Sequence, residues 1–130
     1  MMNALRNGQL DLVLRDVAIM TYESVIQEHL YDDEFVVYAS AGHRLAKLQR
    51  VEIADVASEP WAFPAIDGVV CKWAQRKFED NGLAAPRVTL VGGPMQIRFQ
   101  TVGSSHLLGI APRRIVREVA SQLRLIEIPV

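Results

Sequence analysis

The 130-residue chain contains a single cysteine, Cys71. No disulfide can therefore form within the chain, and such sparse cysteine is typical of a reducing compartment. Neither charge is in excess, with 14 Lys and Arg against 15 Asp and Glu, which argues against DNA binding by this chain alone, because phosphates require a basic surface. No apolar run is long enough to cross a membrane, and no signal-peptide pattern is visible. We therefore predict a cytoplasmic location without membrane contact.

Motifs that indicate a cofactor or a catalytic nucleophile are also missing. The sequence contains no P-loop, no G-x-G-x-x-G and no G-x-S-x-G. Cys71 with His43 or His106 could form the thiol–imidazole pair of a small α/β enzyme. However, Cys71 falls beside the apolar side of an expected helix, where single cysteines are usually part of the core. We expect no catalysis, no cofactor and no metal.

The most informative stretch is 33–46, DEFVVYASAGHRLA. Its first eight residues alternate, and both the set that begins at Phe35 and the set that begins at Val36 are largely apolar. This pattern predicts a strand that is buried on both sides, as a central or parallel strand is. Half of all residues are apolar, which is enough for the core of one domain.

Strands and helices alternate along the rest of the chain, which predicts an α/β fold with a mainly parallel sheet and helices on both faces. Residues 15–30 are interpreted as a connection, and Asp67 as the N-cap of a helix. The expected strands are 10–14, 33–40, 61–65, 87–91, 107–112 and 123–130, and the expected helices are 51–58, 69–81, 94–102 and 113–122. The predicted buried helical stripes are Val70, Trp73, Ala74 and Phe78, and then Met95, Phe99 and Val102. Arg113, Arg114 and Arg117 are interpreted as a solvated helix face.

Several motifs appear in a fixed order: L-x-x-G-x-L-D-L-x-L at 5–14, His43-x-Leu45-Ala46, Pro60-Trp61, and Val102 ten residues before Pro112. Together they resemble the effector-binding domain of LysR-type transcriptional regulators. The chain departs from that pattern at Arg44, where the family usually has proline, and at Ser105 and Leu107, where glycines are usual. The resemblance implies a periplasmic-binding-protein-like fold of two α/β lobes, with a small-molecule effector in the cleft between them.

The resemblance also implies a domain plan. Residues 1–32 are expected to be a remnant of the first lobe and its connection, 33–122 the second lobe, and 123–130 a return strand toward the first lobe. The family's helix-turn-helix is not in this sequence, so DNA would be contacted only through a part outside it. The expected partners are a small-molecule effector, with carboxylates as one candidate class, and a second copy of the chain, because such domains pair and apolar strands would be left as open edges. The alternative interpretation is a free-standing solute-binding or transport-type domain of similar architecture.

Candidate ligand-binding residues follow from the rule that ligands collect beyond the carboxyl ends of parallel strands, near helix N-termini. Two loops fit this rule, one after the strand at Trp61 and one after the strand at Arg87. The resemblance implies in addition that the strand 33–40 crosses between the two lobes and that its end meets the cleft. The alternative interpretation is that both loops are ordinary strand–helix turns without a role in binding. Asp67 argues against an anion at its own loop unless it caps the helix. The candidate set is Ser40, Ala41, Ala65, Ile66, Asp67, Gly68, Gly93, Pro94, Met95 and Gln96.

Overall fold

The computed structural model describes residues 1–15 and 23–130. Two compact units are present, Met1–Asp32 and Asp33–Val130. The first contains the short helix α1 (Met2–Arg6). The strand predicted at 10–14 is wrong: this segment has no strand pairing in the described residues, and Leu10, Leu12 and Leu14 are exposed. Part of the predicted connection, residues 16–22, lies outside the described residues.

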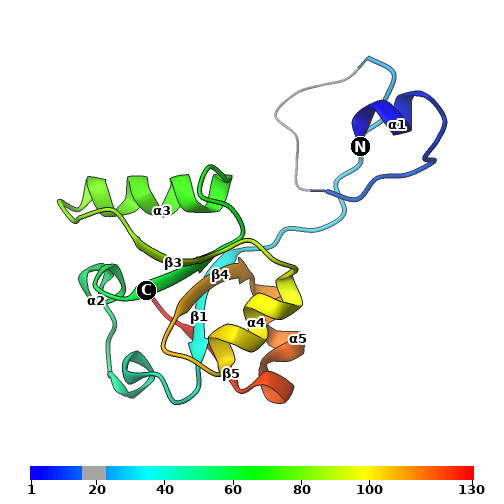
Figure 1. Ribbon diagram of the computed structural model, residues 1–130. Helices are drawn as coiled ribbons and strands as arrows, with labels where there is room; N and C mark the ends of the chain where they lie inside the picture. Colours follow the sequence, from blue (N-terminus) through cyan, green and yellow to red (C-terminus); the bar gives the residue numbers. More distant parts are fainter. Residues whose placement is uncertain (16–22) are drawn as a thin grey trace. The chain divides into compact units, whose positions relative to one another are not determined.

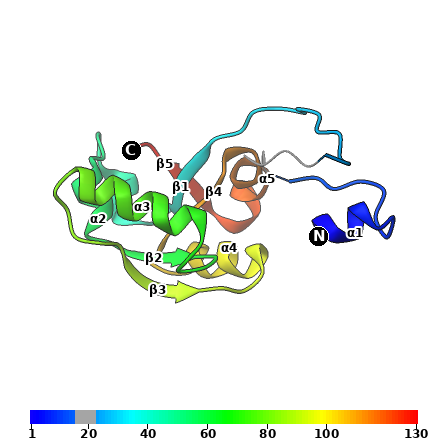
Figure 2. The ribbon, with the colours of Figure 1, turned by 90° about the horizontal axis from the view of Figure 1, so that it is seen from above.

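The second unit is built on a five-stranded sheet with the order β3-β2-β4-β1-β5. Its strands are β1 (Phe35–Ser40), β2 (Pro60–Phe63), β3 (Arg87–Val91), β4 (Leu108–Pro112) and β5 (Leu125–Ile128). β2 is parallel to both β3 and β4, whereas β1 is antiparallel to both of its neighbours, β4 and β5. Figure 2 shows β2 and β3 side by side and pointing in the same direction. The predicted α/β fold with a mainly parallel sheet is confirmed, since β1 alone runs against the other strands.

Helices cover both faces of this sheet, as predicted (Figure 1). On one face lie the short 3-10 helix η1 (Arg44–Lys47), α2 (Ile53–Ala57) and α3 (Val69–Asp80); on the other lie α4 (Met95–Gly103) and α5 (Arg113–Leu123). β1 supplies both cores, as its alternation predicts. Ala39 enters the core under α2 and α3, whereas Val36 and Tyr38 enter the core under α4 and α5.

Aromatic side chains anchor each core. Trp61 stacks on Phe63 with ring centroids 5.5 Å apart and meets Phe78 of α3 at 6.0 Å. In the opposite core, Tyr38 meets the edge of Phe99 at 5.0 Å. Aromatic pairs in such geometry stabilise a core beyond the area that they bury, so both faces of the sheet are firmly packed and the loops at its edges have a rigid base.

The buried stripe of α3 differs from the prediction. Cys71, Ala74 and Phe78 are buried, whereas Trp73 is 49% exposed. Residues three and four apart lie on one helix face, so the sets 70–73–74 and 71–74–78 both satisfy the helical period and share Ala74. Periodicity alone could not choose between these two rotations of the helix. Met95 is likewise 38% exposed, while Phe99 and Val102 of the same helix are buried.

Some helix boundaries also differ from the prediction. Leu123 is the last residue of α5, and Arg124 then adopts a left-handed conformation (φ 52°) that ends the helix, so β5 begins at Leu125. The predicted N-cap role of Asp67 is wrong, because the N-cap of α3 is Gly68 and no side chain caps it. Pro94 occupies the N-cap position of α4, one residue before the first turn.

Candidate functional site

The direction of the strands places three helix N-termini along one edge of the sheet. β2, β3 and β4 are parallel, and each is followed by a helix, α3, α4 and α5 respectively. Their carboxyl ends, and the starts of these helices, therefore lie at the same edge. β1 begins at this edge, because Phe35 pairs with Pro112 at the end of β4. We call this side of the sheet, where the strands β2, β3 and β4 end, the site edge.

The two predicted loops both follow strands that end at the site edge. The loop 64–68 follows β2, the loop 92–94 follows β3, and the backbone N–H of Gly92 donates to the carbonyl of Phe63 at 3.0 Å. Gly92 and Gly93 both adopt positive φ, 86° and 75°, and a Cβ on either would meet nothing within 4 Å. Glycine is therefore required here by backbone conformation, and the space beside these residues is open.

Arg98 fixes the second loop from inside α4. Its guanidinium donates to the carbonyl of Gly92 at 3.3 Å and also to the carbonyl of Gly93. These bonds hold the two glycines against the first turns of the helix. The loop therefore approaches the site edge in a defined conformation.

Ser40 and Ala41 do not join this group. Because β1 is antiparallel to β4, its carboxyl end lies at the opposite edge of the sheet, where Ala41 donates to the carbonyl of Arg124 at 2.7 Å. The prediction that they share an edge with the two loops is wrong. It rested on the family resemblance, in which this strand crosses between the lobes at the cleft, and the sequence carries no signal that β1 is reversed.

The three helix N-termini differ in their charge. None has an acidic residue in its first turn or a capping side chain of its own. At α5, however, Asp33 accepts from the Arg114 backbone N–H at 3.4 Å, so a carboxylate of the protein already faces that terminus. At the start of α3 and of α4, no acidic residue of the first turn faces the backbone N–H groups. Free N–H groups and the helix dipole favour a negatively charged partner.

Arg113 was missed by sequence reasoning, which assigned it to a solvated helix face. It directly follows Pro112 at the end of β4, and its guanidinium binds both Glu127 of β5 and Glu34. These bonds raise the pKa of Arg113, with the hydrogen bond to Glu127 as the largest cause. Its place next to a strand-ending proline was the signal that could have put it at the site edge.

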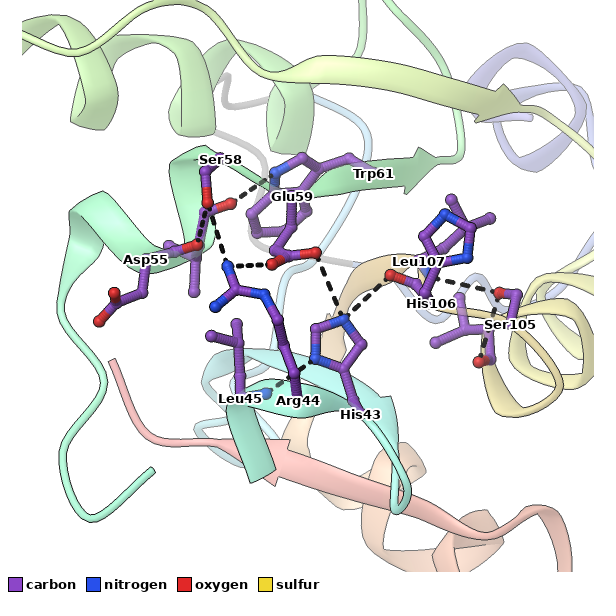
Figure 3. Close-up of polar contacts among 12 residues, drawn as sticks. His43, Arg44, Leu45, Asp55, Ser58, Glu59, Trp61, Ser105, His106 and Leu107 are labelled. Carbon is purple, nitrogen blue, oxygen red and sulfur yellow. Dashed lines mark hydrogen bonds and ion pairs between the residues drawn. The ribbon is translucent and has the colours of Figure 1, made fainter. Parts of the chain in front are cut away.

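On the side of the sheet opposite the site edge, a polar cluster surrounds His43 (Figure 3). The backbone N–H of Leu45 donates to Nδ1 of His43 at 3.2 Å, so Nε2 carries the proton and donates to the carbonyl of His106 at 3.0 Å. Nε2 also lies 3.6 Å from a carboxylate oxygen of Glu59, which forms an ion pair with Arg44. Both ring nitrogens are thus engaged within the fold, and His43 has a structural role.

Cys71 does not form a reactive pair in this arrangement. Its side chain is fully buried among the apolar residues under α3, and burial raises the pKa of the thiol. A thiol held protonated in an apolar core is a poor nucleophile. The geometry therefore gives no support to the thiol–imidazole alternative.

The described surface also has a hollow of about 380 Å³, lined by Gln75, Glu79, Leu83 and Ala85, at the end of α3 remote from the site edge. In residues 1–15 and 23–130, no group of three His, Cys, Asp or Glu side chains could hold a metal ion. In the same residues, no helix has the length and apolar character needed to cross a membrane.

A predominantly parallel sheet covered by helices on both faces is found here, and the likeness to solved structures gives the chain a periplasmic-binding-protein-like fold. The family model of the LysR substrate binding domain matches residues 1–130, so the chain belongs to that family. Its members are the effector-binding domains of transcriptional regulators, which are not enzymes. No curated protein matches the chain.

Solved structures share this fold. A probable transcriptional regulator from Pseudomonas aeruginosa has a TM-score of 0.79 at 22% identity, and the match covers 100% of this chain and 43% of that one. The BenM effector binding domain with its effector benzoate has a TM-score of 0.60 at 18% identity, covering 99% and 58%. The effector binding domain of QuiR in complex with shikimate has a TM-score of 0.61 at 15% identity, covering 75% and 45%. The chain thus spans between 43% and 58% of the length of these structures.

Proposed function

We propose that this chain is part of the effector-sensing region of a LysR-type transcriptional regulator. It binds a small molecule, and its occupancy controls DNA binding and transcription through parts of the protein outside these 130 residues. It acts in the cytoplasm and catalyses no reaction. The observation that carries the proposal is the site edge itself, where the parallel strands β2 and β3 end side by side and the hydrogen bond from Gly92 to Phe63 ties the loop after β3 to the last residue of β2.

The effector that best fits this edge is a small carboxylate. The starts of α3 and α4 carry no acidic residue in their first turns, and such termini favour anions. Benzoate and shikimate, the ligands of the BenM and QuiR structures, both carry a carboxylate. Asp67 is exposed and does not cap α3. Its negative charge opposes an anion at the start of α3, which makes the start of α4 the better place for the carboxylate. The proposed contact residues are Ala65, Ile66, Gly68, Gly93, Pro94, Met95 and Gln96.

Met95 offers a direct test, since it begins α4 and is partly exposed. Met95→Glu places a negative charge beside the proposed contact loop, where it repels a carboxylate, without removing core volume. We expect it to abolish the chemical-shift changes that benzoate or shikimate causes in the amides of Gly93 and Gln96, while the melting temperature stays near that of the wild type. NMR titration suits this test because it detects weak binding.

Ile97→Glu is the matched control. Ile97 is an exposed apolar residue of the same helix, and the substitution makes the same change of charge. It should leave the titration unchanged. Shifts that gather instead around Gln75 and Leu83 would contradict the proposed site, and a melting temperature that falls along with binding would show that Met95 belongs to the core.

We further propose that the chain forms a homodimer. The support is the outermost position of β5 in the sheet and the exposed leucines at 10, 12 and 14. Strand edges and exposed apolar side chains both recruit another chain.

A further inference from the structure

Arg113 joins the start of α5 to two other segments of the chain. Toward β5, Nε donates to the two carboxylate oxygens of Glu127 at 3.2 and 3.1 Å, and Nη2 donates to one of them at 2.8 Å. Toward the start of β1, Nη1 forms an ion pair with Glu34. A guanidinium can serve both carboxylates at once because its donors form a rigid fork.

The backbone around Arg113 reinforces the second of these contacts. The Arg113 N–H donates to the carbonyl of Glu34 at 2.8 Å, and the Arg114 N–H donates to the carboxylate of Asp33 at 3.4 Å. Asp33 and Glu34 are the first residues of the second compact unit. We call them the leading pair. The start of α5 thus holds the place where the chain passes from one unit to the next.

The two arms of the Arg113 contact differ in exposure. The side chains of Arg113 and Glu127 are 31% and 29% exposed, whereas that of Glu34 is 70% exposed. Water and salt weaken ion pairs more as exposure increases, and bidentate pairs are stronger than single contacts. The Glu127 arm is therefore the durable one, and the Glu34 arm is the one that opens first.

We propose that Arg113 is a latch: the Glu127 arm keeps the guanidinium in place, and opening of the Glu34 arm releases the leading pair from α5. With the arm closed, the first residues of the second unit are fixed to α5 by side-chain and backbone bonds. With it open, the leading pair gains freedom while the sheet stays folded. Such a two-state segment end is a physical basis for a conformational switch at the start of the second unit, and it does not depend on the proposed effector.

Hydrogen exchange of the 130-residue chain, followed by NMR, tests the latch. The amides of Arg113 and Arg114 report on it directly, because their acceptors belong to the leading pair. Glu34→Gln should speed exchange at these two amides by about fivefold, the upper range for an exposed ion pair. Added salt should speed them in the wild type but not in Glu34→Gln, while the Val116 amide inside α5 stays unchanged.

Arg50→Gln is the matched control, since it removes the exposed pair of Arg50 with Glu52 at 3.5 Å and touches neither arm. It should leave both reporter amides at the wild-type rate. Glu127→Gln should speed the reporters and the amides of β5 together. The latch is overturned if Glu34→Gln leaves Arg113 and Arg114 unchanged, or if it speeds all of α5 and β1 equally, which would be global destabilisation and would also lower the melting temperature.

Discussion

At the scale of the residue, His43 shows how a polar side chain stabilises the edge of the sheet opposite the site edge. Its ring is buried and links η1, through Leu45, to the carbonyl that precedes β4. Glu59 is only 8% exposed, and its carboxylate is balanced by Arg44 and by the nearby imidazole N–H. A buried polar group without partners is costly, so each member of this cluster depends on the others.

Removal of the imidazole should therefore destabilise the fold. His43→Ala leaves the Leu45 N–H and the His106 carbonyl without their hydrogen bonds to the ring, and we expect a loss of about 2–4 kcal/mol in the free energy of unfolding. Urea denaturation measures it. His106→Ala is the control, because His43 uses only the backbone carbonyl of His106; this variant should lose less than about 0.5 kcal/mol. Equal losses in the two variants would contradict the assigned role of the ring.

Tyr38 should make the free energy of unfolding fall at alkaline pH. Burial raises its pKa from 10.0 to about 12, although the Arg98 guanidinium opposes the shift. Between these values the unfolded chain loses the phenolic proton and the folded chain keeps it, so the unfolded state binds fewer protons and stability falls as pH rises. Below about pH 9 both states are protonated and the residue contributes no pH dependence.

Tyr38→Phe should remove this part of the pH dependence. Between about pH 9 and pH 11 the wild type should lose roughly 1 kcal/mol more than the variant, as measured by urea denaturation at each pH. Tyr31→Phe, at an exposed tyrosine of the first unit, should keep the wild-type slope. A Tyr38→Phe curve parallel to that of the wild type would show that the buried phenol does not cause the loss.

At the scale of the element, α3 shows what periodicity can and cannot predict. The sequence predicted the helix and its limits to within one residue, because Gly68 and Asn81–Gly82 bound an amphipathic run. It placed both Trp73 and Phe78 in the buried stripe, but only Phe78 is buried, in contact with Trp61. Choosing the rotation required knowledge of the neighbouring strand, which local pattern does not contain.

Two substitutions separate these faces of α3. Phe78→Ala should cost about 3–5 kcal/mol, because it removes a buried ring and leaves a cavity beside Trp61. Trp73→Ala should cost less than about 1 kcal/mol, since half of its surface is already in water. Thermal or urea unfolding measures both. A loss at Trp73 that matches the loss at Phe78 would show that the helix is rotated as the sequence first suggested.

At the scale of the whole molecule, the sequence predicted the fold class and the two loops of the site edge but not the placement of β1. The loops at 65–68 and 93–96 follow parallel strands, so a simple rule of α/β sheets brings them together. Strand direction is set by which neighbours a strand meets, and β1 meets β4 and β5, which come about 70 or more residues later. The misplacement of Ser40 and Ala41 and the missed role of Arg113 both follow from that single non-local fact.

Self-association is the last property of the whole molecule that the exposed surfaces allow us to predict. Leu12 and Leu14 are 75% and 65% exposed, and β5 is the outermost strand of its sheet on one side. Burying such leucines is worth about 1.5–3 kcal/mol each, and a homodimer would most often be two-fold symmetric. We therefore expect light scattering at low micromolar concentration to give twice the 14.5 kDa mass of the chain.

The double variant Leu12→Lys/Leu14→Lys should shift the chain toward the monomer, because two charges cannot be buried at an apolar contact without a large cost. Ile97→Lys, at an exposed apolar position of α4, serves as the control and should remain dimeric. If the double variant stays dimeric while its β5 amides remain protected, the contact is formed by the strand edge instead of the leucines. A wild-type monomer in which the amides of Leu12 and Ile126 resist exchange would show that the chain covers both surfaces itself, and the dimer proposal would then be wrong.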